Sequence, residues 1–500
     1  MTPTDHSAGN AHRLARNVFN LLMGQISTTA LTMIMSAAIA RTLGPADFGV
    51  LYLVTAVSTF AYVFVDWGHG AYVIREIARH PERAGELMGS VLGVRAATAV
   101  ALSIPAVLIG WLLGYPARTL VYIAALMAAW IPVYLGLTFG WAFRGKERME
   151  FDALINVALK LLILIVGVTL LVRGAGIGAV IVANAAAGTL TLVVAWVLYR
   201  RLDGNRLRFA PSIARELMVG GAPMVTMTIA VALQPYIDAN MLSRLSTPTV
   251  LGWYSAAMMF ASTLIAPAFV LASAAYPRLS IAASNHDEFR TLLHDALRPL
   301  LFVAVLGAAG TFLFAHVAID IVYSMEKYGQ SATILRAFTP AMVLVFIDMM
   351  LGTAILAAGN AVRLAGAKIL SIVVIAGLEV VLIPYCQARF GNGAIAVMLS
   401  FAVGELVMVA AAIRLLPRGT VHAGIAMDLA RAVAAGVGTV LLMRPLIELS
   451  PFVAIPLSIV MFTGLAVAVR LIRPSDLAAI RRLRKAAPAG APEIAPAVSN

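Results

Sequence analysis

The sequence is poor in charged residues and nearly lacks cysteine. Only 12% of its 500 residues are Asp, Glu, Lys or Arg, and 61% are hydrophobic, whereas soluble domains usually carry about 25% charged residues. This composition excludes an ordinary soluble protein and predicts a chain embedded in a membrane. The single cysteine, Cys386, cannot close an intramolecular disulfide or supply a multi-cysteine zinc site.

Motifs for metal binding and nucleotide hydrolysis are also missing. The sequence has no His-Glu-x-x-His motif and no Gly-rich loop that ends in Gly-Lys-Ser or Gly-Lys-Thr. We therefore expect no metal, no cofactor and no direct ATP hydrolysis. The net charge of +13 is expected to direct membrane insertion, so nucleic acid is not an expected partner.

Long apolar windows dominate what remains. Each is about 20 residues long, the length of a membrane-spanning helix, and too long and too continuously apolar for a strand of a membrane barrel. We therefore expect an all-α polytopic membrane protein whose first span is retained. The fourteen windows lie at about 18–40, 48–66, 88–113, 119–142, 153–172, 177–199, 217–242, 254–276, 299–323, 335–358, 366–385, 394–413, 429–448 and 452–472.

The basic residues predict the orientation of these spans. If the N-terminus is cytoplasmic, 27 of the 37 Lys and Arg residues fall in cytoplasmic segments and 8 in outer segments. The other two, Arg95 and Lys160, lie within spans. Because cytoplasmic loops are enriched in Lys and Arg, we expect both termini to be cytoplasmic and the number of spans to be even.

Several landmark residues recur at a constant displacement of 203 positions. Their places in the span pattern match, which predicts a duplication of six helices. An even number of helices per copy predicts two parallel lobes related by an axis along the membrane normal, with a substrate path between them. The matched landmarks are Arg41 with Arg244, Pro45 with Pro248, Gly49 with Gly252, and Arg95 with Arg298.

This duplication predicts the organisation of the chain. Residues 1–215 would form an N-terminal lobe of six helices, and residues 216–415 a C-terminal lobe of six. Residues 416–474 would add two further helices, and residues 475–500 would form a cytoplasmic tail that is first basic and then rich in Ala and Pro.

Three motifs relate the sequence to a known family. With fourteen spans, they make residues 13–475 resemble the Wzx-type polysaccharide flippases of the multidrug/oligosaccharidyl-lipid/polysaccharide (MOP) exporter superfamily. The motifs are Arg41-Thr-Leu-Gly-Pro-Ala-Asp-Phe-Gly49 after the first span, Trp141-Ala-Phe-Arg-Gly-Lys-Glu-Arg-Met149 after the fourth, and Leu251-Gly-Trp-Tyr-Ser255 before the eighth.

The resemblance implies a function without bond-making chemistry. The protein would be a multi-pass flippase of the inner membrane, not an enzyme, that moves an undecaprenyl-diphosphate-linked oligosaccharide to the outer leaflet for cell-surface polysaccharide biosynthesis. It implies the lipid-linked glycan, membrane lipids and the polysaccharide polymerase and chain-length machinery as partners. A lipid-linked peptidoglycan precursor is a variant of this cargo.

Basic and amide side chains within spans are the candidates for substrate binding. Ionisable residues in a membrane are costly unless they face a partner or an aqueous cavity. Arg95, Lys160 and Arg298 would form a cationic inner vestibule for a diphosphate, and Asn156 and Gln25 lie on polar stripes of the fifth and first spans. The alternatives are snorkelling of the basic side chains to the headgroups and helix packing by the stripes.

Acidic residues in spans are the candidates for ion coupling. A carboxylate in a low-dielectric cavity can exchange a proton as access alternates. The alternatives are an ion pair with a vestibule arginine and burial at headgroup level. The candidates are Glu405, Asp238, Glu379, Asp348 and Asp66.

Two other functions remain to be weighed. A cation-coupled multidrug exporter of the same superfamily would typically hold a carboxylate in its first span, and residues 21–40 contain none. A membrane polymerase or ligase would need a long outer loop with paired acids and arginines. The longest outer connection here, residues 323–334, is only about a dozen residues long.

Overall fold

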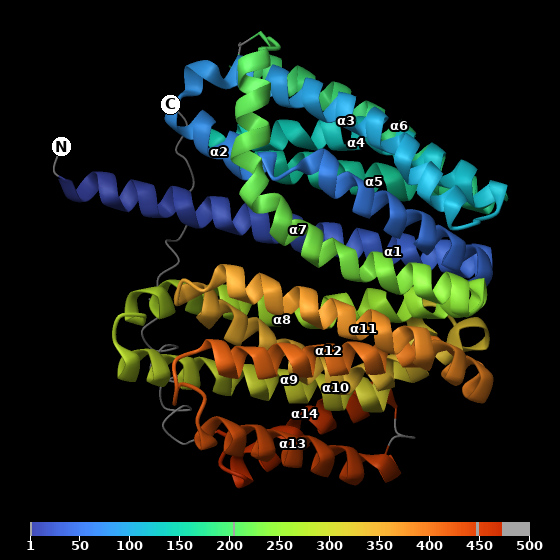
Figure 1. Cartoon of the computed structure of the whole chain (residues 1–500), viewed down its shortest axis with the longest axis vertical. Helices are drawn as coiled ribbons and strands as arrows, with labels where there is room; N and C mark the ends of the chain where they lie inside the picture. Colours follow the sequence, from blue (N-terminus) through green and yellow to red (C-terminus); the bar gives the residue numbers. More distant parts are fainter. Residues whose placement is uncertain (1–2, 204–205, 447–449, 473–500) are drawn as a thin grey trace, which may run out of the picture. The chain divides into compact units, whose positions relative to one another are not determined.

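The computed structural model describes residues 3–203, 206–446 and 450–472, which form fourteen α-helices and two short 3-10 helices without a strand. The all-α class expected from the apolar windows is therefore confirmed. The α-helices (Figure 1) are α1 (Pro3–Asp66), α2 (His69–Arg79), α3 (Ala84–Leu112), α4 (Ala117–Gly145), α5 (Met149–Val172), α6 (Gly176–Asp203), α7 (Pro211–Leu245), α8 (Pro248–Ala282), α9 (His286–Val322), α10 (Met325–Ala357), α11 (Ala361–Phe390), α12 (Ala394–Leu415), α13 (Ala423–Met443) and α14 (Pro451–Ala468).

Helix α1 contains the first two expected spans. It is 64 residues long, and its backbone leaves helical geometry at Gly44, where φ is 75°. Glycine adopts this left-handed conformation without a steric penalty, and the next residue, Pro45, lacks the backbone N–H that would continue the helix. The motif Arg41–Gly49 is thus the bend between the two segments of α1.

Twelve segments of the described residues are long and apolar enough to cross a membrane. The protein is therefore a multi-pass membrane protein. The expected count of fourteen requires in addition that the two segments of α1 cross separately and that α7 crosses, so it stays a prediction. The cytoplasmic position of the termini also stays a prediction, and the expected tail 475–500 lies outside the described residues.

Packing divides the chain into two compact units. Unit 1 comprises Met1–Thr263, His316–Phe338 and Val362–Met408, and unit 2 comprises Leu264–Ala315, Thr339–Ala361 and the chain from Val409 onward. Helices α8 to α12 each contribute residues to both units. These units are defined by contacts, whereas the expected lobes were defined by the repeat in the sequence. The lobes 1–215 and 216–415 and the additional helices 416–474 therefore stay predictions.

Small residues bring the helices of unit 1 close together. Helices α3 to α6 lie side by side (Figure 1), with α4 packed along α6 and α5 packed against both α1 and α6. On α4, a Cβ at Gly136 would lie 3.1 Å from the backbone nitrogen of Leu192. On α6, a Cβ at Gly188 would lie 2.8 Å from that of Val133. Such close backbone approach is the usual means of helix association in lipid.

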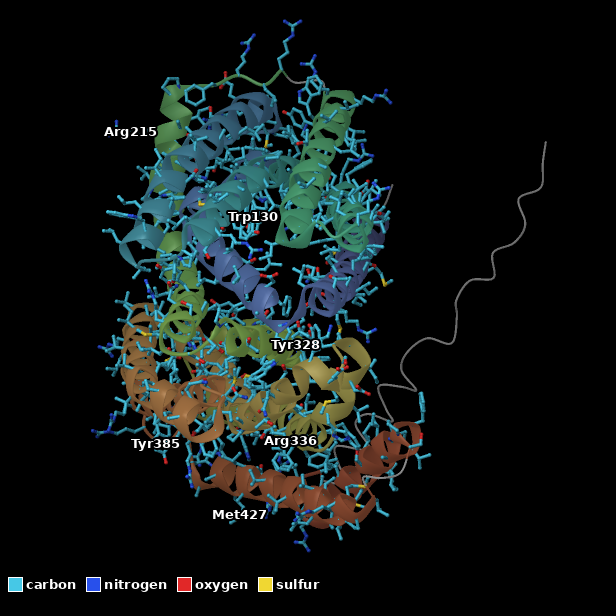
Figure 2. The ribbon with its side chains drawn as sticks, turned by 90° about the vertical axis from the view of Figure 1, so that its right-hand side faces the viewer. Trp130, Arg215, Tyr328, Arg336, Tyr385 and Met427 are labelled. Atoms are coloured by element: carbon cyan, nitrogen blue, oxygen red, sulfur yellow. The ribbon has the colours of Figure 1, made fainter. Side chains whose placement is uncertain are left out.

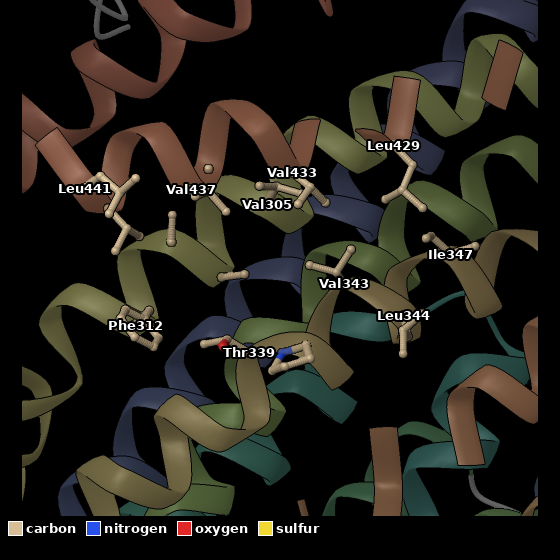
Figure 3. A pocket seen from close by; sticks show the side chains of 15 residues that line it. Val305, Phe312, Thr339, Val343, Leu344, Ile347, Leu429, Val433, Val437 and Leu441 are labelled. Carbon is tan, nitrogen blue, oxygen red and sulfur yellow. The ribbon is translucent and has the colours of Figure 1, made fainter. Parts of the chain in front are cut away.

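Unit 2 has its own apolar core and an apolar cavity. Helices α13 and α14 pack together, and Met443 and Ala454 on these helices meet Leu313 of α9. A cavity of about 520 Å³ is bounded by α9, α10 and α13 (Figure 3). Its lining is aliphatic and aromatic except for Thr339 and contains no charged side chain, so it is not a candidate site for a diphosphate.

The repeat landmarks contact one another reciprocally within unit 1. Gly49 packs so closely on α8 that a Cβ there would clash with the carbonyl oxygen of Pro248. Gly252 packs in the same way on the carbonyl oxygen of Pro45. Each glycine therefore contacts the proline of the other motif, and both positions exclude any larger residue in this arrangement.

The two landmark arginines follow the same pattern. Arg41 donates hydrogen bonds to the carbonyl oxygens of Val322 at 2.9 Å and Ile321 at 2.6 Å, where α9 ends. Arg244 lies over the ring of Tyr115, 5.0 Å from its centroid, in the connection from α3 to α4. In the span pattern these two connections are six helices apart. Reciprocal contacts of this kind are what copies related by a two-fold axis would make, which supports the predicted duplication.

Candidate functional site

Unit 1 contains a cavity of about 460 Å³ whose lining is mainly apolar but includes several polar side chains. Helices α1, α4, α5, α6, α7 and α8 bound it, and Trp130, labelled in Figure 2, contributes from α4. This volume lies in the ordinary range for small-molecule sites. The polar and aromatic residues of its lining include Thr32, Ser36, Tyr52, Trp130, Lys160 and Asn184.

Lys160 is the one basic residue among those that line this cavity. It is placed by α5, which packs against α1 and α6. The side chain is half-buried and makes no hydrogen bond or ion pair with any other residue that the structure describes. A cationic side chain without a protein counter-ion inside a bundle of membrane helices requires water or an anionic ligand.

Arg95 is instead compensated within the protein. Only 2% of the residue is exposed, and its guanidinium donates to Asp66 at 2.7 Å. The guanidinium also lies over Trp141, 4.6 Å from the ring centroid, and 5.7 Å from that of Tyr134. Asp66 thus adopts the internal ion pair that the sequence left open as an alternative to ion coupling.

Arg298 belongs to unit 2 and is also compensated. Its Nε donates to Asp428 at 2.8 Å, and Asp428 accepts a further hydrogen bond from Arg431 at 3.1 Å. The ring of His294 contacts the same carboxylate at 2.9 Å. Asp428 therefore ties α9 to the beginning of α13.

The two amide candidates do not line the cavity of unit 1. Asn156 donates to the carbonyl and carboxylate oxygens of Asp152, at 2.9 and 3.2 Å. The other carboxylate oxygen of Asp152 accepts from Arg144 at 2.7 Å, so this stripe of α5 ends in a polar contact to α4. Gln25 is exposed on α1.

Two of the acidic candidates lie together in unit 1. Asp238 of α7 and Glu379 of α11 are 4% and 0% exposed, and the charges of their carboxyl groups act on each other. Asp238 Oδ1 and both oxygens of Glu379 accept no hydrogen bond from a described residue, which is costly in a buried site. The other oxygen of Asp238 accepts from Tyr254 at 2.8 Å.

Glu405 lies close to this pair. On α12, it forms an ion pair with Lys368 of α11, at 3.5 Å, and the charge of Lys368 also acts on Asp238. The structure thus brings three of the five acidic candidates into one cluster with a single lysine. Asp348, on α10, is half-buried in unit 2.

Some residues of these clusters escaped the sequence analysis. Lys368 was counted among the residues of the cytoplasmic segments, although it is the third residue of the apolar window 366–385. Tyr52 and Tyr254 carry no charge, but each follows a matched glycine of the two repeat motifs within three positions. Asp428 precedes its expected window by one residue and gave no signal of its partners, because Arg298 is 130 residues away.

Known proteins resemble this chain in sequence. Residues 14–282, more than half of the chain, match the family described as "Polysaccharide biosynthesis protein". A protein of Escherichia coli (strain K12), the "Putative O-antigen transporter", is 23% identical over 366 residues, which cover 70% of this chain and 85% of that protein.

Solved structures resemble it in fold. Lipid II flippase MurJ, in an inward closed conformation, superimposes with a TM-score of 0.70 at 14% identity over 91% of this chain and 100% of that chain. A multidrug resistance MATE family transporter of the MOP superfamily, facing inward, gives 0.63 at 16% identity over 80% and 97%. The resemblance inferred from the three motifs is confirmed, and with it a transporter rather than an enzyme. The chain belongs to the polysaccharide biosynthesis protein family, with the fold of the MOP superfamily.

Proposed function

We propose that this protein is a flippase that moves an undecaprenyl-diphosphate-linked oligosaccharide from the cytoplasmic to the outer leaflet of the inner membrane. The observation that carries the proposal is Lys160, which lies without a protein counter-ion in a cavity bounded by membrane helices. A diphosphate would supply the missing negative charge through charge-assisted hydrogen bonds. The polar and aromatic lining suits the sugars next to it.

The match to an O-antigen transporter supports this cargo. O-antigen transport concerns a glycan of the cell surface, and a lipid-linked glycan combines the three features that the unit 1 cavity would have to accommodate. These are an anionic group for Lys160, hydroxyl groups for the polar lining and a lipid chain that stays in the bilayer. Membrane lipids and the polymerase and chain-length machinery remain the proposed partners.

We further propose that translocation is coupled to an ion through Asp238, Glu379 and Glu405. Asp238 and Glu379 are almost completely buried, and both oxygens of Glu379 accept no hydrogen bond from a described residue. Lys368 lies 3.5 Å from Glu405 and offsets its charge. Proton exchange at such a cluster would change its charge as the two sides of the membrane gain access in turn. The reciprocal contacts of Gly49 and Gly252 support the two-lobed, parallel arrangement that alternating access would use.

The proposal is tested in liposomes that contain purified protein and a fluorescent undecaprenyl-diphosphate disaccharide. Flipping is measured as the fraction of signal that a membrane-impermeant quencher can reach. Lys160→Ala should slow flipping by roughly tenfold, the worth of one hydrogen bond to a charged group. Lys160→Arg, which keeps the charge, is the matched control and should retain most of the rate.

The outcomes separate the site from the cargo. Equal rates for wild type and Lys160→Ala would remove Lys160 from the site but leave the cargo standing. Wild-type flipping no faster than in empty liposomes, even with an imposed proton gradient, would contradict the cargo. Expulsion of a cationic dye from the same liposomes would then favour the multidrug exporter, and elongation of the glycan would favour a polymerase or ligase.

A further inference from the structure

An indole ring lines the cavity of unit 1 and is held in place by two tyrosines. Trp130 of α4 is half-buried at this cavity (Figure 2). The centroid of its ring lies 5.4 Å from that of Tyr62 and 5.8 Å from that of Tyr134. The hydroxyl group of Tyr62 donates to the Met127 carbonyl at 2.8 Å, and the ring of Tyr134 contacts the guanidinium of Arg95. Because both neighbours are themselves fixed, the ring of Trp130 is pre-positioned.

Trp130 and Asn184 each keep one polar group without a hydrogen-bond partner among the described residues. The indole N–H groups of Trp67 and Trp253 donate to backbone carbonyl oxygens, but that of Trp130 does not. Asn184 of α6 also lines the cavity, and its amide nitrogen donates to the carbonyl oxygen of Val180 at 2.8 Å, which leaves the amide oxygen. An indole N–H can only donate and an amide oxygen can only accept. A sugar hydroxyl group, which does both, suits this combination.

The packing of α4 against α6 places these two side chains at one depth. A Cβ at Gly188 of α6 would lie 2.8 Å from the backbone nitrogen of Val133 of α4, and a second such contact follows about one turn later on both helices. The two helices therefore run parallel. Trp130 lies three residues before Val133, and Asn184 lies four residues before Gly188. Each step is about one helical turn, so the indole and the amide lie side by side on neighbouring helices.

Lys160 lies at another depth of the same cavity. Helices α5 and α6 pack together and are joined by residues 173–175 alone, so they run antiparallel. A Cβ at Gly167 of α5 would lie 3.5 Å from the Cβ of Ala183 on α6. Lys160 precedes Gly167 by seven residues, so it lies level with the position seven residues after Ala183, which is six residues beyond Asn184. At 1.5 Å per residue, the two levels are roughly 9 Å apart along the helices, a separation that one diphosphate with its first sugar can bridge.

We propose that Trp130 and Asn184 form a sugar subsite that recognises the first sugar of the lipid-linked glycan while Lys160 binds the diphosphate. The indole ring packs on the C–H face of the sugar, and the indole N–H and the amide oxygen hydrogen-bond to its hydroxyl groups. The inference rests on the proposed function, because it names the residues that select the glycan of that cargo. A lipid diphosphate without a sugar would meet Lys160 but neither residue of the subsite.

The polar groups favour a sugar over the lipid chain as the occupant of this subsite. An apolar chain could also pack on an indole ring. It would, however, leave the N–H of Trp130 and the amide oxygen of Asn184 without partners and away from water, which is costly. A pocket that combines an apolar surface with a few placed polar groups is the usual design for a ligand of mixed polarity, and a sugar has both an apolar face and hydroxyl groups.

The test compares the dissociation constants of two fluorescent ligands for the full-length protein in nanodiscs: undecaprenyl-diphosphate disaccharide and undecaprenyl diphosphate without a sugar. Wild type should bind the disaccharide more tightly. Trp130→Ala should weaken disaccharide binding roughly tenfold, the worth of a half-buried aromatic ring, and leave binding of the sugar-free lipid unchanged. Lys160→Ala should weaken both. Trp111→Ala is the matched control, because Trp111 is 62% exposed on α3 and does not line the cavity; it should bind both ligands as wild type does.

Three further variants separate the chemistry of the subsite from its bulk. Trp130→Phe keeps an aromatic ring and should retain most of the preference for the disaccharide. Trp130→Leu keeps an apolar side chain without a ring and should lose this preference, as Trp130→Ala does. Asn184→Leu removes the acceptor from another helix and should lower the preference while the sugar-free lipid binds as before.

The results distinguish this inference from the proposed function. Disaccharide affinities that Trp130→Ala, Trp130→Leu and Asn184→Leu all leave unchanged would overturn the subsite. Equal weakening of both ligands in all three variants would also overturn it, because the residues would then shape the cavity rather than select a sugar. Wild type that binds the two ligands equally would overturn the subsite and leave a lipid diphosphate as the cargo. Wild type that binds neither ligand would overturn the proposed function as well.

Discussion

The reciprocal glycine contacts predict how the balance between conformations can be shifted. Gly49 and Gly252 allow α1 and α8 to approach until each glycine touches the proline carbonyl of the other motif. A methyl group at either position would meet backbone atoms, which cannot rotate away as a side chain can. Gly49→Ala and Gly252→Ala should therefore destabilise the described conformation relative to one in which these helix ends separate.

The size of the shift follows from the cost of overpacking. An extra methyl group in a close-packed contact typically costs about 1–3 kcal/mol, and each 1.4 kcal/mol changes a population ratio tenfold. Each substitution should thus raise the ratio of separated to closed protein by roughly 5- to 150-fold. Since both methyl groups act on one contact, the double variant should shift the ratio by less than the product of the single effects.

Spin labels at the exposed residues Ala46 and Thr247 report this separation as a second, longer distance in electron spin resonance. The substitution Cys386→Ala provides the cysteine-free background. Gly377→Ala is the matched control, because a Cβ at Gly377 meets no atom within 4 Å. Distance distributions of Gly49→Ala and Gly252→Ala that match those of Gly377→Ala would refute the reasoning.

Three further predictions concern charges outside the cavity. Asp66→Asn should lower the free energy of unfolding by roughly 2 kcal/mol. The loss is smaller than the roughly 3–5 kcal/mol typical of a broken buried ion pair, because the Asp66 side chain is 40% exposed. Thermal unfolding in detergent measures the loss, and an unchanged unfolding midpoint would exclude a stabilising ion pair. Asp428→Asn should favour proteolysis where α13 begins, since it removes the carboxylate that Arg298, Arg431 and the ring of His294 share, and wild-type cleavage rates would argue against this role. Burial lowers the pKa of His422, whose ring nitrogen accepts a hydrogen bond from the Gly424 N–H and so caps α13. The cap should contribute roughly 1 kcal/mol of stability above the ordinary pKa of histidine, and this contribution should be lost as the pH falls below that value. His422→Ala should remove this part of the pH dependence of stability, and parallel pH profiles for the two proteins would rule the cap out.

Continuous apolar runs made most helices predictable. From α3 onward, every described α-helix overlaps one of the expected windows, because a span must be apolar over about 20 residues wherever it packs. Helix α2 was missed for the same reason. It has buried positions only on one face, at Val73 and Ile77, and its charged residues hide it from a search for apolar windows, although spacing of four residues is an amphipathic helix signal.

The charge pairs were less predictable than the helices. The depth of a residue in its span follows from counting along the chain, and it drew attention to Arg95 and Lys160 alike. Whether such a charge is compensated depends on the rotation of its helix and on which helix lies opposite. Asp66 reaches Arg95 because α1 packs beside α3, and no comparable carboxylate of the described residues faces Lys160.

This difference bears on how a flippase could release its cargo. A diphosphate diester carries a negative charge on each phosphate, so three uncompensated cations in one cavity would hold it tightly, and tight binding slows release on the far side of the membrane. In unit 1 Asp66 neutralises the charge of Arg95. Among the described residues that line the cavity, only Lys160 is basic. A site with one fixed cation needs further donors at the moment of capture and must lose them at release. The hydroxyl group of Tyr52, which lines the same cavity, can serve as such a donor.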